Sequence, residues 1–406
     1  MSTHPPCTLG GPAACLLLAA SIAAQRTWIV DQTGGGDFTD IPPAVAAASP
    51  GDTVWVRSDG QYTSPTTSKG LRIVTTAAAA PQGVLVVQGL PAGQELVLSG
   101  FGWSWQPTTF ALQLVDNAGR VQIEDLTMTP PGAVPNQTRG FVEVTRCADV
   151  AFNRAVLYEV IVTDSRVLMT GVRVYGNTEL HGPGAATHIA IDAVDSRLLL
   201  SGCTVVAGYS WWTFGRPLLP AAGIRTSGGE LVVTGGSGDR VIGGRIYNGT
   251  YFVYPAPIES DGGVVTTDPD VPMLDGQQLA ASPSGTSTFV QRDVPFVLCP
   301  PAFGQGHDFR PSIHHKPGNL AGLLVALPSA PRPLPPFGEL WLDPATMLAA
   351  GSGVLAGSGN EGSLSFSLPI GSGVLPPGLV LSFQAAVVDQ GAVELSQPVR
   401  ASVLAR

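Results

Sequence analysis

Charge and lysine are both scarce in this sequence, and the shortage excludes one class of partner. Only 13% of the 406 residues are charged, well below the usual share of about a quarter. Lysine occurs only at positions 69 and 316. The formal net charge is -9 and no basic run interrupts the acidity, so the chain repels phosphate backbones. We therefore expect no nucleic-acid partner.

Long apolar runs are also missing, which argues against a membrane span in the mature chain. The segment AACLLLAASIAAQ near the N-terminus is shorter than the ~20 residues that cross a bilayer. Its length is typical of a secretory signal peptide, although no Lys or Arg precedes it. We expect residues 1–24 to be a signal peptide, cleaved after Ala23 or Ala24, and the protein to be secreted or held at the cell surface.

Cysteine is too sparse for a disulfide framework. After cleavage Cys147, Cys203 and Cys299 remain, an odd number without metal-binding spacing, and we expect buried, unpaired thiols. His307, Asp308, His314 and His315 could suggest a metal cluster, but adjacent histidines in a strand point to opposite faces. A solvated loop is the prediction there, with no metal ion and no cofactor.

Glycine and proline are abundant instead, and the first glycine-rich stretch indicates how the fold begins. The chain holds 50 Gly and 36 Pro beside 44% hydrophobic residues, which favours a turn-rich β protein. In TGGGDFTDIPPAVAAASPGDTVWV, from Thr33 to Val56, Thr39 or Asp40 can cap a short helix. Ile41, Val45 and Ala48 form its apolar stripe, and a strand follows. The glycines lack the GK[ST] ending of a phosphate loop.

This stretch resembles the N-terminal cap of parallel β-helix proteins of the pectin-lyase-like superfamily. The residues that match the cap pattern are Gly36, Asp37, Phe38, Thr39, Ile41, Val45, Ala47, Gly51, Asp52, Thr53, Val54, Val56, Gly60 and Tyr62. The resemblance implies an all-β, right-handed parallel β-helix whose open end is covered by this helix, since an exposed terminal coil needs a cover.

The chain that follows repeats itself, as a solenoid requires. Similar segments begin at Gly119, Ala148, Ser165, Ser196 and Gly229, and each pairs two short apolar strands around small turn residues. A further strand precedes several of them, so one coil runs strand, turn, strand, turn, strand over roughly 20–30 residues. We assign residues 25–290 to the β-helix and residues 291–406, with their evenly spaced short strands, to a C-terminal β-sandwich.

Two recurring tetrapeptides carry the candidate catalytic residues. TDSR and VDSR place Asp164 beside Arg166 and Asp195 beside Arg197, and Asp192 lies just before the second. In β-helix lyases such groups could hold Ca²⁺ and abstract a proton. Asp and Ser also form turns by bonding to the backbone, and recurrence at one point of successive coils favours that structural role.

Two insertions are rich in aromatic residues and follow equivalent points of adjacent coils. They contain the candidate ligand-binding residues Tyr209, Trp211, Trp212, Tyr251 and Tyr254. Exposed aromatic rings offer flat apolar faces to sugars, and loops on a rigid scaffold commonly bind ligands. The alternative is that the loops fold back and bury the rings.

Three functions remain open at this point, because a β-helix fold does not determine activity. The first is a secreted, non-catalytic protein that contacts polysaccharide or envelope material. The second is a polysaccharide lyase or glycoside hydrolase; the sequence keeps only His181-Gly182 of the Gly-His-Gly segment of polygalacturonases. The third is a structural stalk or adhesin that binds another protein.

Overall fold

The computed structural model describes eleven stretches of the chain. They are residues 25–75, 77–103, 110–128, 141–176, 189–211, 221–247, 252–299, 303–304, 308–358, 361–369 and 379–404. The expected signal peptide, residues 1–24, lies outside them. No helix in the described part is long and apolar enough to cross a membrane.

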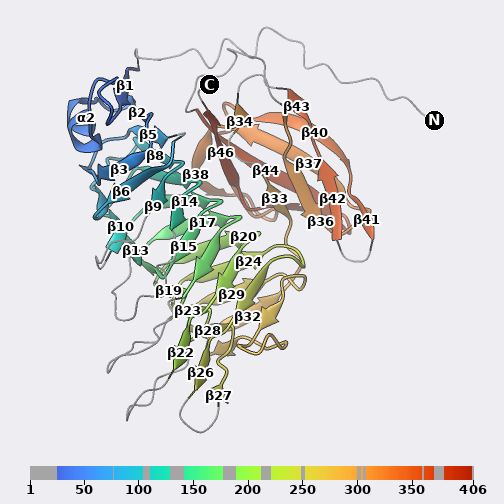
Figure 1. Cartoon of the computed structure of the whole chain (residues 1–406). Coiled ribbons are helices and arrows are strands. Elements are labelled where there is room, and N and C mark those ends of the chain that lie inside the picture. Colours follow the sequence, from blue (N-terminus) through green and yellow to red (C-terminus); the bar gives the residue numbers. More distant parts are fainter. Residues whose placement is uncertain are drawn as a thin grey trace.

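Three long parallel sheets run through the first two thirds of the described chain (Figure 1). The eleven-stranded sheet contains β1 (Thr27–Val30), β2 (Thr53–Val56), β5 (Arg72–Thr75), β8 (Glu95–Ser99), β11 (Arg120–Glu124), β14 (Asp149–Asn153), β17 (Arg166–Thr170), β20 (Arg197–Ser201), β24 (Glu230–Thr234), β29 (Val264–Thr267) and β32 (Thr288–Gln291). The nine-stranded sheet contains β4 (Thr66–Thr67), β7 (Leu85–Gln88), β10 (Phe110–Val115), β13 (Phe141–Thr145), β16 (Val160–Thr163), β19 (Ile191–Val194), β23 (Ile224–Ser227), β28 (Ile258–Asp261) and β31 (Ser284–Gly285). The seven-stranded sheet contains β9 (Gly102–Trp103), β12 (Thr127–Met128), β15 (Val156–Tyr158), β18 (Arg173–Tyr175), β21 (Thr204–Val206), β25 (Arg240–Ile242) and β30 (Met273–Leu274).

From β7 to β30, each coil visits the three sheets in the same order, which confirms the predicted parallel β-helix. One coil is β13, β14 and β15, and the next is β16, β17 and β18. Equivalent strands pair in parallel and in register, so Val150 lies opposite Val167, which lies opposite Leu198. A separate parallel pair, β3 (Gly60–Thr63) and β6 (Ala79–Gln82), lies in the first coils.

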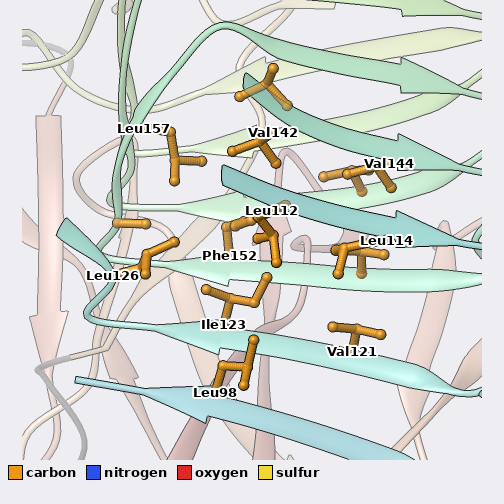
Figure 2. Packing of buried hydrophobic residues seen from close by; sticks show 14 of the residues in the cluster. Leu98, Leu112, Leu114, Val121, Ile123, Leu126, Val142, Val144, Phe152 and Leu157 are labelled. Carbon is orange, nitrogen blue, oxygen red and sulfur yellow. The ribbon is translucent and has the colours of Figure 1, made fainter. Parts of the chain in front are cut away.

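Inward side chains stack in rows through successive coils and form the core. Leu98, Ile123 and Phe152 occupy one register position of the eleven-stranded sheet. Leu112 and Val142 form a row from the nine-stranded sheet. All are buried, and Figure 2 shows these rows packed in the interior. A coil alone could not bury its apolar face, so each depends on its neighbours.

The corner between the nine-stranded and eleven-stranded sheets is tight and repeats. One residue of each coil adopts a left-handed conformation at this corner, with φ between 46° and 56° in Asp116, Arg146, Asp164 and Asp195. Asp tolerates this conformation better than most residues do. The next coil places Gly228 there with φ of 73°. The residue after it, Gly229, also has a positive φ of 72°, and a Cβ there would lie 2.0 Å from the backbone carbonyl oxygen of Ser196, so this coil requires glycine at position 229.

A small polar residue follows the left-handed residue and bonds to the neighbouring coil. The backbone N–H of Cys147 donates to Oγ of Ser165 at 2.9 Å, and the N–H of Ser165 donates to Oγ of Ser196 at 3.1 Å. Each serine hydroxyl donates to a carbonyl two residues earlier at 2.7 Å. TDSR and VDSR are therefore turns that link one coil to the next.

Helix α2 (Ile41–Ala47) covers the N-terminal end of the solenoid, as predicted. Asp40 is its N-cap and accepts the N–H of Ile41 at 2.8 Å. The ammonium of Lys69 donates to three carbonyls at the other end, those of residues 45, 46 and 48, at 2.8–3.0 Å. A cation at a helix C-terminus interacts favourably with the helix dipole, so one of the two lysines has a definite structural task.

The last third of the chain forms mainly antiparallel sheets. The last strand of the three long parallel sheets, β32, ends at Gln291, and the first strand of the C-terminal sheets, β33, begins at Phe296. One sheet contains β33 (Phe296–Leu298), β36 (Ser312–His315), β42 (Glu361–Ser365) and β41 (Ala356–Ser358). The other contains β34 (Phe303–Gly304), β46 (Val399–Leu404), β44 (Val380–Asp389), β37 (Leu320–Ala326) and β40 (Leu348–Val354), with β45 (Ala392–Leu395) beside β44. Two further pairs are β35 (Asp308–Phe309) with β43 (Leu368–Pro369), and β38 (Pro328–Pro333) with β39 (Glu339–Leu342).

These antiparallel sheets share their own core, which is typical of a β-sandwich. Phe309, Ile313, Leu323 and Phe383 are buried in one cluster, separate from the core of the solenoid. The division of the chain into two domains near residue 291 remains our proposal.

The sandwich docks on the outer face of the eleven-stranded sheet. Trp341 is buried against Ala151, Leu168, Leu199 and Val232, and these four occupy one register position of successive strands. Figure 1 shows β46 and β33 alongside the strands of this sheet. The outward side chains here are therefore as buried as those of the core.

A buried ion pair fixes the same contact. Nη1 and Nη2 of Arg400 lie 3.0 and 2.8 Å from the carboxylate of Asp149, and the Arg400 side chain is 1% exposed. Nδ2 of Asn153 donates to the backbone carbonyl of Arg400 at 2.8 Å. A buried pair of this kind specifies one docking position, because every displaced arrangement leaves a charge unpaired.

Candidate functional site

The two aromatic insertions leave the solenoid at the same corner and pair with each other. The first contains β22 (Tyr209–Trp211), and the second contains β26 (Arg245–Tyr247) and β27 (Phe252–Val253). β22 pairs with β26 in parallel, which places Trp211 opposite Tyr247. β26 pairs with β27 in antiparallel fashion. We call this three-stranded sheet the aromatic sheet; it lies at the end of the solenoid opposite α2 (Figure 1).

The described side chains of the aromatic sheet form a cation and ring cluster. Cζ of Arg245 lies 3.9 Å from the ring centroid of Phe252. The rings of Phe252 and Tyr254 lie 6.1 Å apart with a 32° angle between their planes, and both residues are half-buried. A guanidinium beside such rings can pair with a carboxylate or hydroxyl.

The remaining candidate binding residues are placed only in part. Tyr209 and Trp211 belong to β22, but their side chains lie outside the described residues. Trp212 and Tyr251 lie outside the described residues altogether. Of the five candidates, Tyr254 alone is described with its side chain.

A second aromatic pair lies on the outer face of the seven-stranded sheet, and the sequence analysis did not single it out. Tyr158 and Tyr175 are opposite each other on β15 and β18, with ring centroids 5.6 Å apart. Val206 continues the row on β21, the strand that directly precedes β22. The signal was present in the sequence, since AVLYE and VRVYG place tyrosine at the same point of successive repeats.

The candidate catalytic aspartates are divided between a corner and a sheet. Asp164 and Asp195 are exposed at the corner described above. Asp192 lies on β19, on the nine-stranded sheet, where Nε of Arg225 donates to its Oδ1 at 3.0 Å. This hydrogen bond raises the pKa of Arg225.

The two candidate arginines take part in docking the sandwich. Arg166 and Arg197 lie over the ring of Trp341, with Cζ 5.4 and 5.6 Å from its centroid. Arg197 also pairs with Glu230 at 2.7 Å and with Glu339 at 2.6 Å. The five candidates therefore do not converge on one open site: Asp192 and Arg197 are in ion pairs, and the arginines face the sandwich.

The paired histidines are not in a solvated loop, and that prediction is wrong for them. His314 and His315 belong to β36. His314 stacks on Phe296 with ring centroids 4.9 Å apart, and His315 is 8% exposed. Burial lowers the pKa of both imidazoles. Their surroundings come from strands far away in the sequence, which local pattern cannot show; His307 lies outside the described residues.

The thiols are in unreactive surroundings. Cys147 and Cys203 are buried and unpaired, as predicted, whereas Cys299 is only half-buried by its exposed surface. Burial raises the pKa of all three, for Cys203 to about 12. The thiol form therefore predominates at neutral pH, and it is a poor nucleophile.

Comparisons with known proteins add little to this geometry. No protein-family model matches the sequence, and no curated protein matches it. Among solved structures, the chain is similar to the chitinase ChiW from Paenibacillus sp. str. FPU-7, described as a bacterial cell-surface-expressed multi-modular enzyme machinery. The sequence identity is 10%, the TM-score is 0.19, and the match covers 93% of this chain and 24% of that one. A similarity this weak says nothing about the ligand or activity of this chain.

Proposed function

We propose that the protein is a non-catalytic β-helix protein, exported to the cell surface or beyond, that binds polysaccharide through the aromatic sheet. The observation that carries this proposal is the pairing of β22 with β26. Two insertions from adjacent coils form one sheet rather than separate loops, and that sheet concentrates tyrosine, tryptophan and phenylalanine at one end of a rigid solenoid.

The chemistry of the described cluster suits a sugar ligand. Phe252 and Tyr254 are half-buried rings, and Arg245 lies over one of them. Aromatic faces pack on the apolar face of a pyranose, and the guanidinium can bond to hydroxyl or carboxylate oxygens. The tyrosine pair on the seven-stranded sheet, Tyr158 and Tyr175, extends the same kind of surface toward the cap.

Retention on insoluble glycans tests the proposal. The full mature chain is incubated with a panel of neutral and acidic polysaccharides, and the bound protein is quantified. Unsaturated products and reducing ends released into solution are assayed in parallel. We expect retention on at least one glycan and no product. Trp211→Ala should weaken retention about 10-fold or more, because one stacking contact contributes on the order of 1 kcal/mol beyond the area it buries.

A matched control separates binding from folding. Trp55→Ala removes a half-buried tryptophan from β2, at the capped end of the solenoid, and should leave retention unchanged. Failure of the parent to bind any glycan, or equal retention of Trp211→Ala and the parent, would remove the glycan proposal. Release of product by the parent would overturn its non-catalytic part.

A further inference from the structure

A small acidic cavity lies where the last coils meet the sandwich. It has a volume of about 50 Å³, enough for an ion with bound water. The solenoid contributes Asp268 and Asp270, which follow β29, and Asp293, which follows β32. The sandwich contributes His315 from β36, with Lys316 directly after it.

The three aspartates converge within the dimensions of one coordination sphere. One carboxylate oxygen from each lies within 4.8 Å of those of the other two. Ca²⁺ binds oxygen ligands at about 2.3–2.6 Å, so ligands on opposite sides of the ion are about 5 Å apart. Asp268 is buried, while Asp270 and Asp293 are half-buried. The carboxylates can therefore contact one such ion with little movement.

The imidazole of His315 provides an independent indication of a missing partner. The residue is 8% exposed and lines the same cavity. Nδ1 accepts a hydrogen bond from Nδ2 of Asn319 at 3.0 Å, so Nε2 carries the ring hydrogen. Nε2 is buried and has no hydrogen-bond partner among the described residues. An unpartnered buried nitrogen costs about 1–3 kcal/mol. A water molecule bound to a cation in the cavity would satisfy it.

The cation already present does not balance the carboxylates. The ammonium of Lys316 forms an ion pair with Asp293 and lies 4.0 Å from Asp389. Asp268 accepts backbone N–H groups of Asp270 and Val294 at 3.0 and 3.3 Å, but these bonds supply no positive charge. The cavity therefore keeps an excess of negative charge.

We propose that this cavity binds a calcium ion through Asp268, Asp270 and Asp293, with Nε2–H of His315 donating a hydrogen bond to a water on the ion. The ion would join the last coils of the solenoid to the sandwich, because the carboxylates come from one and the imidazole from the other. This site is independent of the proposed glycan binding and lies in a different part of the molecule from the aromatic sheet.

Calorimetric titration of the full mature chain with CaCl₂, after removal of metals by a chelator, tests the site. We expect one ion per chain and a rise in the thermal unfolding midpoint as calcium is added. Asp270→Asn should abolish both, without disturbing the backbone bonds that Asp268 makes. Asp261→Asn, which changes an exposed carboxylate on β28, should leave both unchanged.

Two further variants test the roles of the histidine and the lysine at the cavity. His315→Gln should weaken calcium binding about 10-fold or more, the usual effect of removing a group that orients a metal's ligands. Lys316→Met removes a competing positive charge and should strengthen binding. The proposal is overturned if millimolar calcium does not bind, if Asp270→Asn binds as well as the parent, or if Mn²⁺ binds and Ca²⁺ does not.

Discussion

The outer faces of the eleven-stranded and nine-stranded sheets are built on the same scaffold but meet different surroundings. On the eleven-stranded sheet the outward positions Leu168, Leu199 and Val232 are at most 7% exposed, because Trp341 and the sandwich cover them. On the nine-stranded sheet the equivalent outward row includes Ile161, Asp192 and Arg225 and remains accessible.

The difference shows what decides the composition of a solenoid face. Both rows point away from the core, so the need to fill the interior cannot explain either of them. The covered residues are aliphatic because another unit packs on them, and the open row carries the Asp192–Arg225 ion pair because water solvates it. Asp149, a buried carboxylate on the covered face, is correspondingly paired with Arg400.

The largest contrast is expected between two ion pairs, one on each face. Asp149→Ala leaves the buried guanidinium of Arg400 without its partner and should cost about 3–5 kcal/mol in the free energy of unfolding. Asp192→Ala removes a partly exposed partner of Arg225 and should cost about 0.2–1 kcal/mol. Denaturant unfolding measures both values, and similar values would contradict the distinction between the faces.

The dependence of stability on pH should differ between two carboxyls of the covered face. Burial raises the pKa of Glu124, which bonds to Ser402 and Gln122. The folded state therefore binds the proton of Glu124 more tightly than the unfolded state does. Glu124 reduces the free energy of unfolding as the pH rises above its ordinary pKa near 4.5. Glu124→Gln should remove that loss.

Asp149 should behave in the opposite way. Burial alone would raise its pKa, but the guanidinium groups of Arg400 and Arg120 lower it overall. The stabilisation that Asp149 contributes is therefore present at pH values above its ordinary pKa near 3.8, and it is lost as the pH falls through the lowered pKa. Thermal unfolding of Glu124→Gln and the parent across pH 4–8 tests the prediction for Glu124. A parent that gains stability relative to the variant as pH rises would contradict that prediction.

The smallest effect is expected at the corner between the two sheets. Asp195→Gly keeps the left-handed conformation that Asp195 adopts and should change stability by no more than about 0.5 kcal/mol. Asp195→Val places a β-branched residue there and should cost about 1–3 kcal/mol. If a lyase activity were found and Asp195→Gly abolished it, the assignment of this residue to a turn alone would be wrong.

The repeats and the cap could be predicted from the sequence because they depend on local pattern. Alternating apolar residues determine which side chains face the interior, and Asp40 with its following helix forms a local capping motif. The recurrence of DSR correctly indicated a turn, since Ser165 and Ser196 bond to neighbouring coils.

The docking of the sandwich could not be predicted in the same way. Arg400 and Asp149 are 251 positions apart, and no local pattern connects them. Arg166 and Arg197 looked like candidates for chemistry because their partner, Trp341, comes from a distant segment. The histidines of β36 were misjudged for the same reason, since their burial depends on packing between remote strands.

Docking also limits how this molecule can change in length. A solenoid can gain or lose a coil with little disturbance, because each coil contacts only its neighbours. Here Trp341 lies across residues of β14, β17, β20 and β24, while Arg400 pairs with β14 alone. An added coil between β14 and β24 would shift these contacts by about 4.8 Å relative to one another. Contacts to the sandwich also extend back to Glu124 on β11, which bonds to Ser402, and forward to Asp293 after β32, which pairs with Lys316. Changes in coil number are therefore compatible with this docking only toward the cap, before β11.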